Sequence, residues 1–197
     1  MKRPERRLRR FTRAELAVHH ATAALMIICL VTAACLYVPE IAAAVGRRGP
    51  IKTLHVVAGL ALPLPVLLGW ASRAFREDVR LLNRFGRRDR DWLRGRPAAP
   101  GKFNAGQKLN AAFVAGAILV MFGTGVMLTW PGPWPDRLRT GATFVHDWLT
   151  IAILVMFLGH LWFAMRDRGA LAGITTGTVD ARWAARHHPA WDAVRKH

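Results

Sequence analysis

Four long apolar stretches, separated by segments rich in arginine, set the limits on what this chain can fold into. They cover residues 17–38, 53–75, 109–130 and 145–165, and none contains more than one Asp, Glu, Lys or Arg residue. About 20 apolar residues of α-helix cross the hydrocarbon core of a bilayer, where a helix also satisfies its own backbone hydrogen bonds. The sequence therefore predicts an all-α integral membrane protein, built as a four-helix bundle.

The charge of the chain is consistent with a membrane environment. In a soluble protein, a formal net charge of +17 over 197 residues would suggest nucleic-acid binding. Here, however, the basic residues and the hydrophobic residues, which make up 52% of the chain, occur in alternating blocks along the sequence. We therefore expect lipid as the surrounding medium and no nucleic acid as a partner.

The basic residues also predict the orientation. Counted over alternate connecting segments, 24 of the 29 Lys and Arg residues fall on one side of the membrane and 5 on the other. Because cytoplasmic segments carry the excess of Lys and Arg, we expect cytoplasmic N- and C-termini. The expected organisation is a basic cytoplasmic arm (1–16), a four-span domain (17–165) and a cytoplasmic tail (166–197). A cleaved signal peptide is the alternative for the first stretch, which is longer than the roughly 7–15 apolar residues of such peptides.

Two histidines on the fourth stretch lie on one face of the expected helix. His146 and His160 are 14 residues apart, close to four helical turns, which is roughly 21 Å along the helix axis. Because the hydrocarbon core of a bilayer is about 30 Å thick, one imidazole would lie near each membrane surface. This spacing suits two cofactors, one above the other, both bound by the same helix.

Two further histidines lie at the ends of other stretches, His19 at the cytoplasmic end of the first and His55 at the outer end of the second. The expected positions of the histidines in the membrane therefore predict two pairs, His55 with His146 near the outer surface and His19 with His160 near the cytoplasmic surface. Each pair joins two helices, as axial ligands on opposite faces of a haem must. We expect two haem b groups with bis-histidine ligation, which leaves no open iron position and favours electron transfer.

The cysteines limit the possible cofactors, and one of the four expected ligands stays undecided between two neighbouring histidines. The chain has two cysteines and no Cys-x-x-Cys-His motif, so neither covalent haem attachment nor a cysteine-bound cluster is expected. His20 adjoins His19, and helical phase does not decide which of the two faces inward. Any single histidine could instead form hydrogen bonds inside the bundle. His187, His188 and His197 lie in the polar tail, where solvated or structural roles are expected.

A series of short motifs runs along nearly the whole chain. They are Arg10-Phe11-Thr12-Arg13-Ala14-Glu15 ahead of His19, Leu54-His55-Val56-Val57-Ala58-Gly59-Leu60, the segment 101–110, His146-Asp147, Gly159-His160, Gly169-Ala170-Leu171 with Gly173 and Gly177, and Arg182-Trp183-Ala184 with His187-His188-Pro189. The most specific is the segment 101–110, Gly-Lys-Phe-Asn-Ala-Gly-Gln-Lys-Leu-Asn, which leads into the third stretch. In this order the motifs resemble the cytochrome b (gamma) subunit of membrane-bound formate dehydrogenases.

The resemblance implies a site and partners. In that family, two b haems relay electrons from an iron–sulfur subunit on the outer face to a quinone, menaquinone or ubiquinone, which is reduced near the inner haem. By position, the haem ligands of the family correspond to His19, His55, His146 and His160. The segment at its quinone pocket corresponds to Asn104, Gly106 and Gln107. The family usually has tryptophan where this chain has His20, which supports His19 as the ligand.

The chemistry of the segment 101–108 is compatible with a quinone site. Asn104 and Gln107 carry amide donors for a quinone carbonyl, and Gly106 would let the backbone approach the ring closely. The alternative is a helix N-cap at Asn104 followed by a surface loop. The two interpretations do not exclude each other.

The sequence thus favours a membrane-anchoring dihaem cytochrome of the bacterial inner membrane, which passes electrons from an outer-face iron–sulfur subunit to quinone near the cytoplasmic side. The chain contains no visible formate site, so the catalytic dehydrogenase subunit would be a separate partner. The nearest alternative is a cytochrome b subunit of another oxidoreductase, such as a hydrogenase or a thiosulfate reductase. A haem-free membrane scaffold or transporter is the alternative from a different class.

Overall fold

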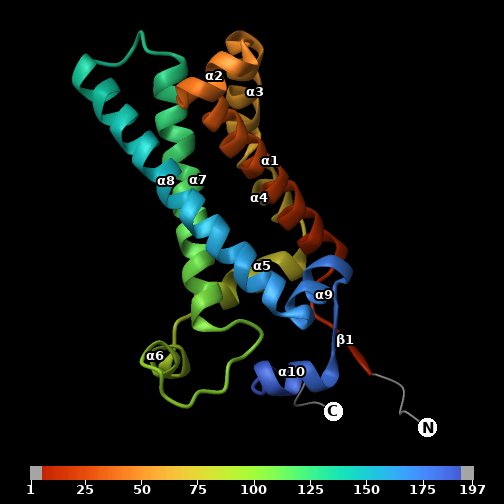
Figure 1. Cartoon of the computed structure of the whole chain (residues 1–197). Helices are drawn as coiled ribbons and strands as arrows, with labels where there is room; N and C mark the ends of the chain where they lie inside the picture. Colours follow the sequence, from red (N-terminus) through yellow and green to blue (C-terminus); the bar gives the residue numbers. More distant parts are fainter. Residues whose placement is uncertain (1–5, 192–197) are drawn as a thin grey trace. The chain divides into compact units, whose positions relative to one another are not determined.

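The computed structural model describes residues 6–191, which contain four helical segments long and apolar enough to cross a membrane (Figure 1). Three are single helices, α1 (Arg13–Tyr37), α7 (Ala105–Thr129) and α8 (Asp136–Arg166). The second span consists of α3 (Arg48–Ala61) followed by α4 (Leu64–Gly69). The prediction of an all-α membrane bundle with four spans is confirmed.

The second span is interrupted at its prolines. Pro63 and Pro65 have no backbone N–H to donate, and the helix breaks between α3 and α4. The span also ends earlier than the apolar stretch, at Gly69 instead of Phe75. The reason is a helix cap, because the hydroxyl of Ser72 accepts a hydrogen bond from the N–H of Phe75 (3.4 Å) and starts the next helix.

Shorter elements complete the described chain. They are α2 (Pro39–Val45), α5 (Arg73–Leu82), α6 (Arg87–Leu93), α9 (Arg168–Thr176) and α10 (Ala181–His187), with the strands β1 (Arg7–Arg9) and β2 (Thr178–Asp180). The described residues form two compact units. We call residues 17–68 and 114–158 the central unit, and residues 6–16, 69–113 and 159–191 the terminal unit.

A short antiparallel ladder joins the two ends of the terminal unit. β1 pairs with β2, and Leu8 stands opposite Val179. Gly177 precedes β2 with a φ of +77°, and its carbonyl oxygen accepts hydrogen bonds from the N–H groups of Arg10 (2.8 Å) and Phe11 (3.0 Å). A Cβ at Gly177 would lie 2.7 Å from the Phe11 carbonyl oxygen, so glycine is required here. No sequence pattern predicts this ladder.

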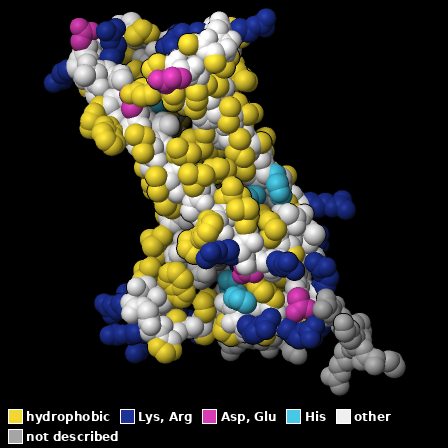
Figure 2. Space-filling view, viewed as in Figure 1, with side chains coloured by type: hydrophobic (Ala, Val, Ile, Leu, Met, Phe, Trp, Pro, Cys, Tyr) yellow, Lys and Arg dark blue, Asp and Glu magenta, His cyan; other side chains and the backbone are white. Residues whose placement is uncertain are grey.

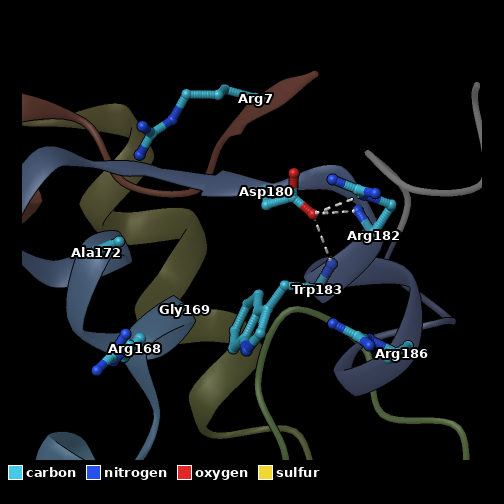
Figure 3. Close-up of a pocket in the computed structure, with 8 residues that line it drawn as sticks. All are labelled: Arg7, Arg168, Gly169, Ala172, Asp180, Arg182, Trp183 and Arg186. Atoms are coloured by element: carbon cyan, nitrogen blue, oxygen red, sulfur yellow. Dashed lines mark hydrogen bonds and ion pairs between the residues drawn. The ribbon is translucent and has the colours of Figure 1, made fainter. Parts of the chain in front are cut away.

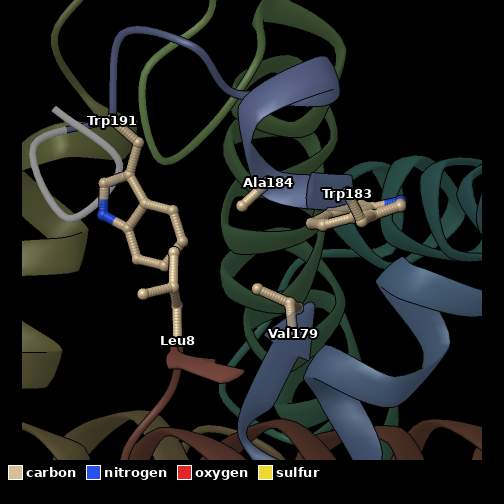
Figure 4. Close-up of a cluster of buried hydrophobic side chains, with 5 residues drawn as sticks. All are labelled: Leu8, Val179, Trp183, Ala184 and Trp191. Atoms are coloured by element: carbon tan, nitrogen blue, oxygen red, sulfur yellow. The ribbon is translucent and has the colours of Figure 1, made fainter. Parts of the chain in front are cut away.

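A cluster of buried apolar side chains packs between the N-terminal arm and the tail (Figure 4). Its members are Leu8, Val179, Trp183, Ala184 and Trp191. Trp183 also covers Gly169, where a Cβ would collide with the indole ring. Its indole N–H donates a hydrogen bond to Oδ1 of Asp167 (2.8 Å), which also caps α9. The tail is therefore packed against the arm as far as Trp191, whereas His197 lies outside the described residues.

Large hydrophobic side chains are exposed along the spans, as the space-filling view shows (Figure 2). Leu68, Leu119 and Phe163 expose 75%, 70% and 74% of their surface. A soluble monomer rarely exposes extended apolar patches, because contact with water is unfavourable for them. Lipid hydrocarbon would cover these side chains at no such cost.

Candidate functional site

Two histidines from different spans lie next to each other in the central unit. His55 lies in α3 and His146 in α8, both half-buried, and their ring centroids are 6.3 Å apart with an angle of 65° between the ring planes. A metal ion bound by two imidazoles lies about 2 Å from each ligating nitrogen, which separates the ring centroids by roughly 6 Å. The separation of these two rings therefore fits an iron held between them.

A threonine hydroxyl beside each ring determines where the imidazole proton lies. Thr32 Oγ1 is 2.9 Å from Nδ1 of His55, and Thr124 Oγ1 is 2.9 Å from Nδ1 of His146. Each hydroxyl donates its own proton to the carbonyl oxygen four residues earlier in its helix, at 2.6 Å and 2.8 Å respectively. The hydroxyl is left to accept from the imidazole, so Nδ1 carries the proton and Nε2 keeps its lone pair. This is the neutral form in which histidine binds a metal.

These two threonines are candidate site residues that the sequence did not predict. Each is a polar residue inside an apolar span, and this is the one signal in the sequence that points to them. A polar side chain in a membrane helix needs a partner inside the protein. Only the packing of α1 on α3, and of α7 on α8, shows that the partner is a histidine.

The other two predicted ligands lie in different units. His19, on α1 in the central unit, is half-buried, whereas the adjacent His20 is exposed, which favours His19 as the inward-facing residue. One turn further on, Thr22 has a buried hydroxyl with no hydrogen-bond partner within residues 6–191. Because buried polar atoms normally have a partner, this hydroxyl is suited to contact a bound group. His160 lies on α8 in the terminal unit, and its pairing with His19 stays a prediction.

The segment predicted to bind quinone begins α7 as a helix cap. Asn104 Oδ1 accepts a hydrogen bond from the backbone N–H of Gln107 (2.9 Å), and Gln107 Oε1 accepts one from the backbone N–H of Asn104 (3.0 Å). This reciprocal pair satisfies two N–H groups at the start of the helix. The cap interpretation is confirmed. The cap uses the side-chain oxygens of Asn104 and Gln107, so the NH₂ groups of these two residues remain to donate to a ligand.

Gly106 is a contact point between α7 and α6. A Cβ at this position would lie 3.1 Å from Cη2 of Trp92, so the absence of a side chain lets the indole approach the helix. The close approach expected at Gly106 is therefore made by a protein side chain. A direct contact of Gly106 with a quinone stays a prediction.

A cavity of about 760 Å³ lies beside the start of α7, within the terminal unit. Asn104 lines it, whereas Gly106 and Gln107 do not. Its aromatic lining residues, which the sequence reasoning did not identify, are Phe85, Trp92 and Phe103. Lys108 adds a positive charge, with Nζ 2.9 Å from Asp89 Oδ2 and 5.6 Å from the centroid of the Phe85 ring. Arg84, Arg87 and Arg88 also line the cavity, so its wall combines aromatic rings with several cationic groups. The aromatic part of the wall suits a small ring-shaped ligand.

A buried ion cluster borders this cavity. Lys102, one of the lining residues, places Nζ 2.6 Å from both carboxylate oxygens of Asp78 and 3.2 Å from Oε1 of Glu15. Burial, together with the neighbouring Glu15 carboxyl, raises the pKa of Asp78 to about 7, although Lys102 acts in the opposite direction. A carboxyl group with a pKa near neutrality takes up and releases protons readily at physiological pH.

Most of the chain is similar to one known protein family. A family model described as prokaryotic cytochrome b561 matches residues 10–177. This range contains the four predicted haem ligands and the capping segment at the start of α7.

Curated relatives match a shorter part of the chain. The cytochrome b556(Fdn) subunit of the nitrate-inducible formate dehydrogenase of Escherichia coli (strain K12) is 32% identical over 94 residues, 46% of this chain and 43% of that protein. The cytochrome b556(fdo) subunit of formate dehydrogenase from the same strain is 27% identical over 94 residues, 46% of this chain and 44% of that protein. The formate dehydrogenase cytochrome b556 subunit of Haemophilus influenzae is 28% identical over 95 residues, 46% of this chain and 40% of that protein. The matched region thus spans less than half the length of these relatives.

Proposed function

The chain belongs to the prokaryotic cytochrome b561 family, and from this premise we propose that it is the membrane-anchoring dihaem cytochrome b subunit of a formate dehydrogenase complex. Family membership and four membrane-length helices make it a multi-pass protein of the bacterial inner membrane that binds haem b. In the proposed complex, a catalytic dehydrogenase subunit oxidises formate. An iron–sulfur subunit then delivers the electrons to this chain, which passes them to a quinone.

The observation that carries this proposal is the pair formed by His55 and His146. Two imidazoles from separate helices lie at a separation that fits a shared iron, and Thr32 and Thr124 leave both Nε2 atoms available. The hydrogen bond at Nδ1 also holds each ring in orientation and raises the basicity of its Nε2. His55 and His146 would hold a haem, which would supply one-electron transfer, and ligation by both imidazoles would leave no position for a further ligand.

We assign the second haem to His19 and His160. The support is the family resemblance and the position of His160 on α8, 14 residues after His146, so that one helix would contribute a ligand to each haem. Both haems would lie in the four-span domain, residues 17–165. The arm (1–16) and the tail (166–197) would flank this domain in the cytoplasm, as the excess of Lys and Arg favours.

The cavity beside Asn104 is the proposed quinone site. The NH₂ group of Asn104 would donate a hydrogen bond to a carbonyl oxygen of menaquinone or ubiquinone. Gln107 would act through the cap, by holding Asn104 in place, and Gly106 by letting Trp92 close the wall of the cavity. Reduction of a quinone to the quinol consumes two electrons and two protons. The ion cluster around Lys102 would supply protons next to this cavity.

A different electron donor is the second candidate. It is favoured by the short match to the formate dehydrogenase subunits, which covers less than half of their length, and by the family description, which names no donor. The same haems and quinone site would then serve a hydrogenase, a thiosulfate reductase or another oxidoreductase.

Reduction of the haems by formate tests the proposed function. The native complex is purified through a tag on this chain, and formate or hydrogen is added without oxygen. We expect a reduced b-type α band with formate and no band with hydrogen. Reduction by hydrogen alone would contradict the formate assignment. A haem-supplied preparation that shows no α band after chemical reduction would overturn the cytochrome assignment as a whole.

A further inference from the structure

We propose that a cleft in the terminal unit binds the phosphate group of an anionic phospholipid. The cleft has a volume of about 430 Å³ (Figure 3). The arginines that line it are Arg7, Arg168, Arg182 and Arg186, and we call it the arginine cleft. Three of the four lie outside residues 10–177, the range that matches the family model, and the cleft shares no residue with the haem or quinone sites.

Separate elements bring the four arginines together. One comes from β1, one is the first residue of α9, and two lie four residues apart on one side of α10. The ladder of β1 and β2 fixes the first of these elements to the start of α10. Trp183 of α10 packs onto Gly169 of α9 and donates a hydrogen bond to Asp167, the residue that caps α9. These contacts hold α10 against α9. The cleft is therefore built by backbone pairing and buried packing.

The arginine cleft has an excess of positive charge. Asp180 is the one acidic residue among those that line it, and its Oδ1 already accepts hydrogen bonds from two N–H groups at the start of α10, 3.8 Å from Nε of Arg182. Within residues 6–191, the guanidinium groups of Arg7, Arg168 and Arg186 make no ion pair and no hydrogen bond. Guanidinium groups bind phosphate oxygens in pairs of parallel hydrogen bonds. A phosphate in this cleft would offset the repulsion between the arginines.

The residues that precede Arg168 in the sequence favour a lipid as the source of that phosphate. The membrane helix α8 ends at Arg166, two residues before Arg168, and its last turns expose Trp162 and Phe163. The guanidinium of Arg166 lies 4.0 Å above the Trp162 ring. Exposed tryptophan and arginine at the end of a span are typical of the headgroup layer. In this layer the arginine cleft would meet anionic lipid headgroups directly.

Lipid binding by the full-length protein tests the proposal. Detergent-purified chain is mixed with phosphatidylglycerol or with zwitterionic phosphatidylcholine, and bound lipid is counted by native mass spectrometry. We expect the double variant Arg168→Gln/Arg186→Gln to bind phosphatidylglycerol about thirtyfold more weakly, because each arginine near an anionic surface contributes roughly fivefold. The matched control, Arg80→Gln/Arg90→Gln, removes two exposed arginines of α5 and α6 and should bind as the unchanged chain does.

Two further measurements complete the test. The single variant Arg186→Gln, on an exposed position of α10, should lose about fivefold if the double variant does not fold. Inorganic phosphate is added as a competitor, and it should not displace phosphatidylglycerol. Displacement by phosphate would assign the cleft to a soluble anion and overturn the lipid assignment. An equal loss in the cleft and control variants, or equal binding of the two lipids, would overturn the site itself.

Discussion

At the scale of single residues, His55 and His146 form the same kind of hydrogen bond at Nδ1. Each Nδ1–H group donates a hydrogen bond to a threonine hydroxyl, and each hydroxyl donates one to a backbone carbonyl oxygen of its own helix. An accepting group at Nδ1 makes Nε2 a stronger donor to a metal and stabilises the more positively charged, oxidised iron. Thr32 and Thr124 would therefore influence both the affinity for haem and its reduction potential.

Replacement of either threonine tests this role. Thr32→Val and Thr124→Val keep the side-chain shape and remove the acceptor, so we expect each variant to hold the haem about tenfold more weakly and to raise its midpoint potential. Potentiometric titration of the purified chain measures the change. Thr143→Val is the matched control, because the Thr143 hydroxyl, which lies nearer the start of α8, donates a hydrogen bond to the carbonyl oxygen of Arg139 (3.0 Å) and has no histidine partner among residues 6–191. Potentials in both test variants equal to that of the control would contradict the role.

The sequence predicts four histidine ligands, whereas it does not identify the two threonines as candidates. Histidines in apolar segments are rare and costly, and helical spacing alone places His146 and His160 on one face. Threonine is common in membrane helices, where its hydroxyl can bond to the preceding turn. Its contact with a histidine on another helix depends on how the helices pack, and single-sequence patterns do not contain that information.

At the scale of elements, the start of α7 combines a structural and a proposed binding role in Asn104. Asn104→Asp keeps the oxygen that caps the helix and removes the NH₂ group, whereas Asn104→Ala removes both. We expect Asn104→Asp to slow quinone reduction about tenfold, as for one lost hydrogen bond, with haem content and thermal stability unchanged. Asn104→Ala should in addition destabilise the fold by about 1 kcal/mol. Unchanged turnover of Asn104→Asp with saturating donor would remove this residue from the quinone site.

The tail is attached to the loop before α7 through a buried histidine. His188 is 3% exposed, and its Nδ1 donates to the carbonyl oxygen of Gly101 (2.7 Å). Burial, helped by the nearby positive charge of Arg10, lowers the pKa of His188 from 6.5 to about 4. The unfolded chain therefore takes up this proton first as the pH falls. The stabilisation is complete above pH 6.5 and is lost as the pH falls towards 4, by about 3 kcal/mol in total.

Thermal unfolding at several pH values, followed by tryptophan fluorescence, measures this loss. His188→Gln keeps a donor for Gly101 and cannot be protonated, so we expect it to lose much of the decrease in stability between pH 6.5 and 4. His187→Gln, at the exposed neighbouring position, should keep the pH dependence of the unchanged chain. The role of His188 is contradicted if all three proteins respond to pH in the same way.

Long elements could be predicted from the sequence more completely than short ones. The four spans follow from apolar length, and the start of α7 follows from Asn104. The ladder of β1 and β2 has three residues per strand, too few for a periodic pattern, and its partners are about 170 residues apart in the chain. Its formation depends on contacts that only the folded chain makes.

At the scale of the whole molecule, the proposed sites would make the chain a path for electrons across the membrane. Electrons would enter at the outer haem, pass to the inner haem and reduce quinone on the cytoplasmic side. The protons consumed would come from the cytoplasm, next to the ion cluster around Lys102. Negative charge would then move inward while cytoplasmic protons are consumed, so each turnover would separate charge across the membrane.

The proposed electron path requires that His55 and His146 bind the same haem. Redox titration of the purified chain, with haem content measured on the same samples, tests that claim most directly. We predict two b haems of different midpoint potential in the unchanged chain and in the control His20→Ala. In His55→Ala and in His146→Ala we predict a single haem, with the same midpoint potential in both variants. Loss of different haems in the two variants, or retention of both haems in either one, would contradict the account.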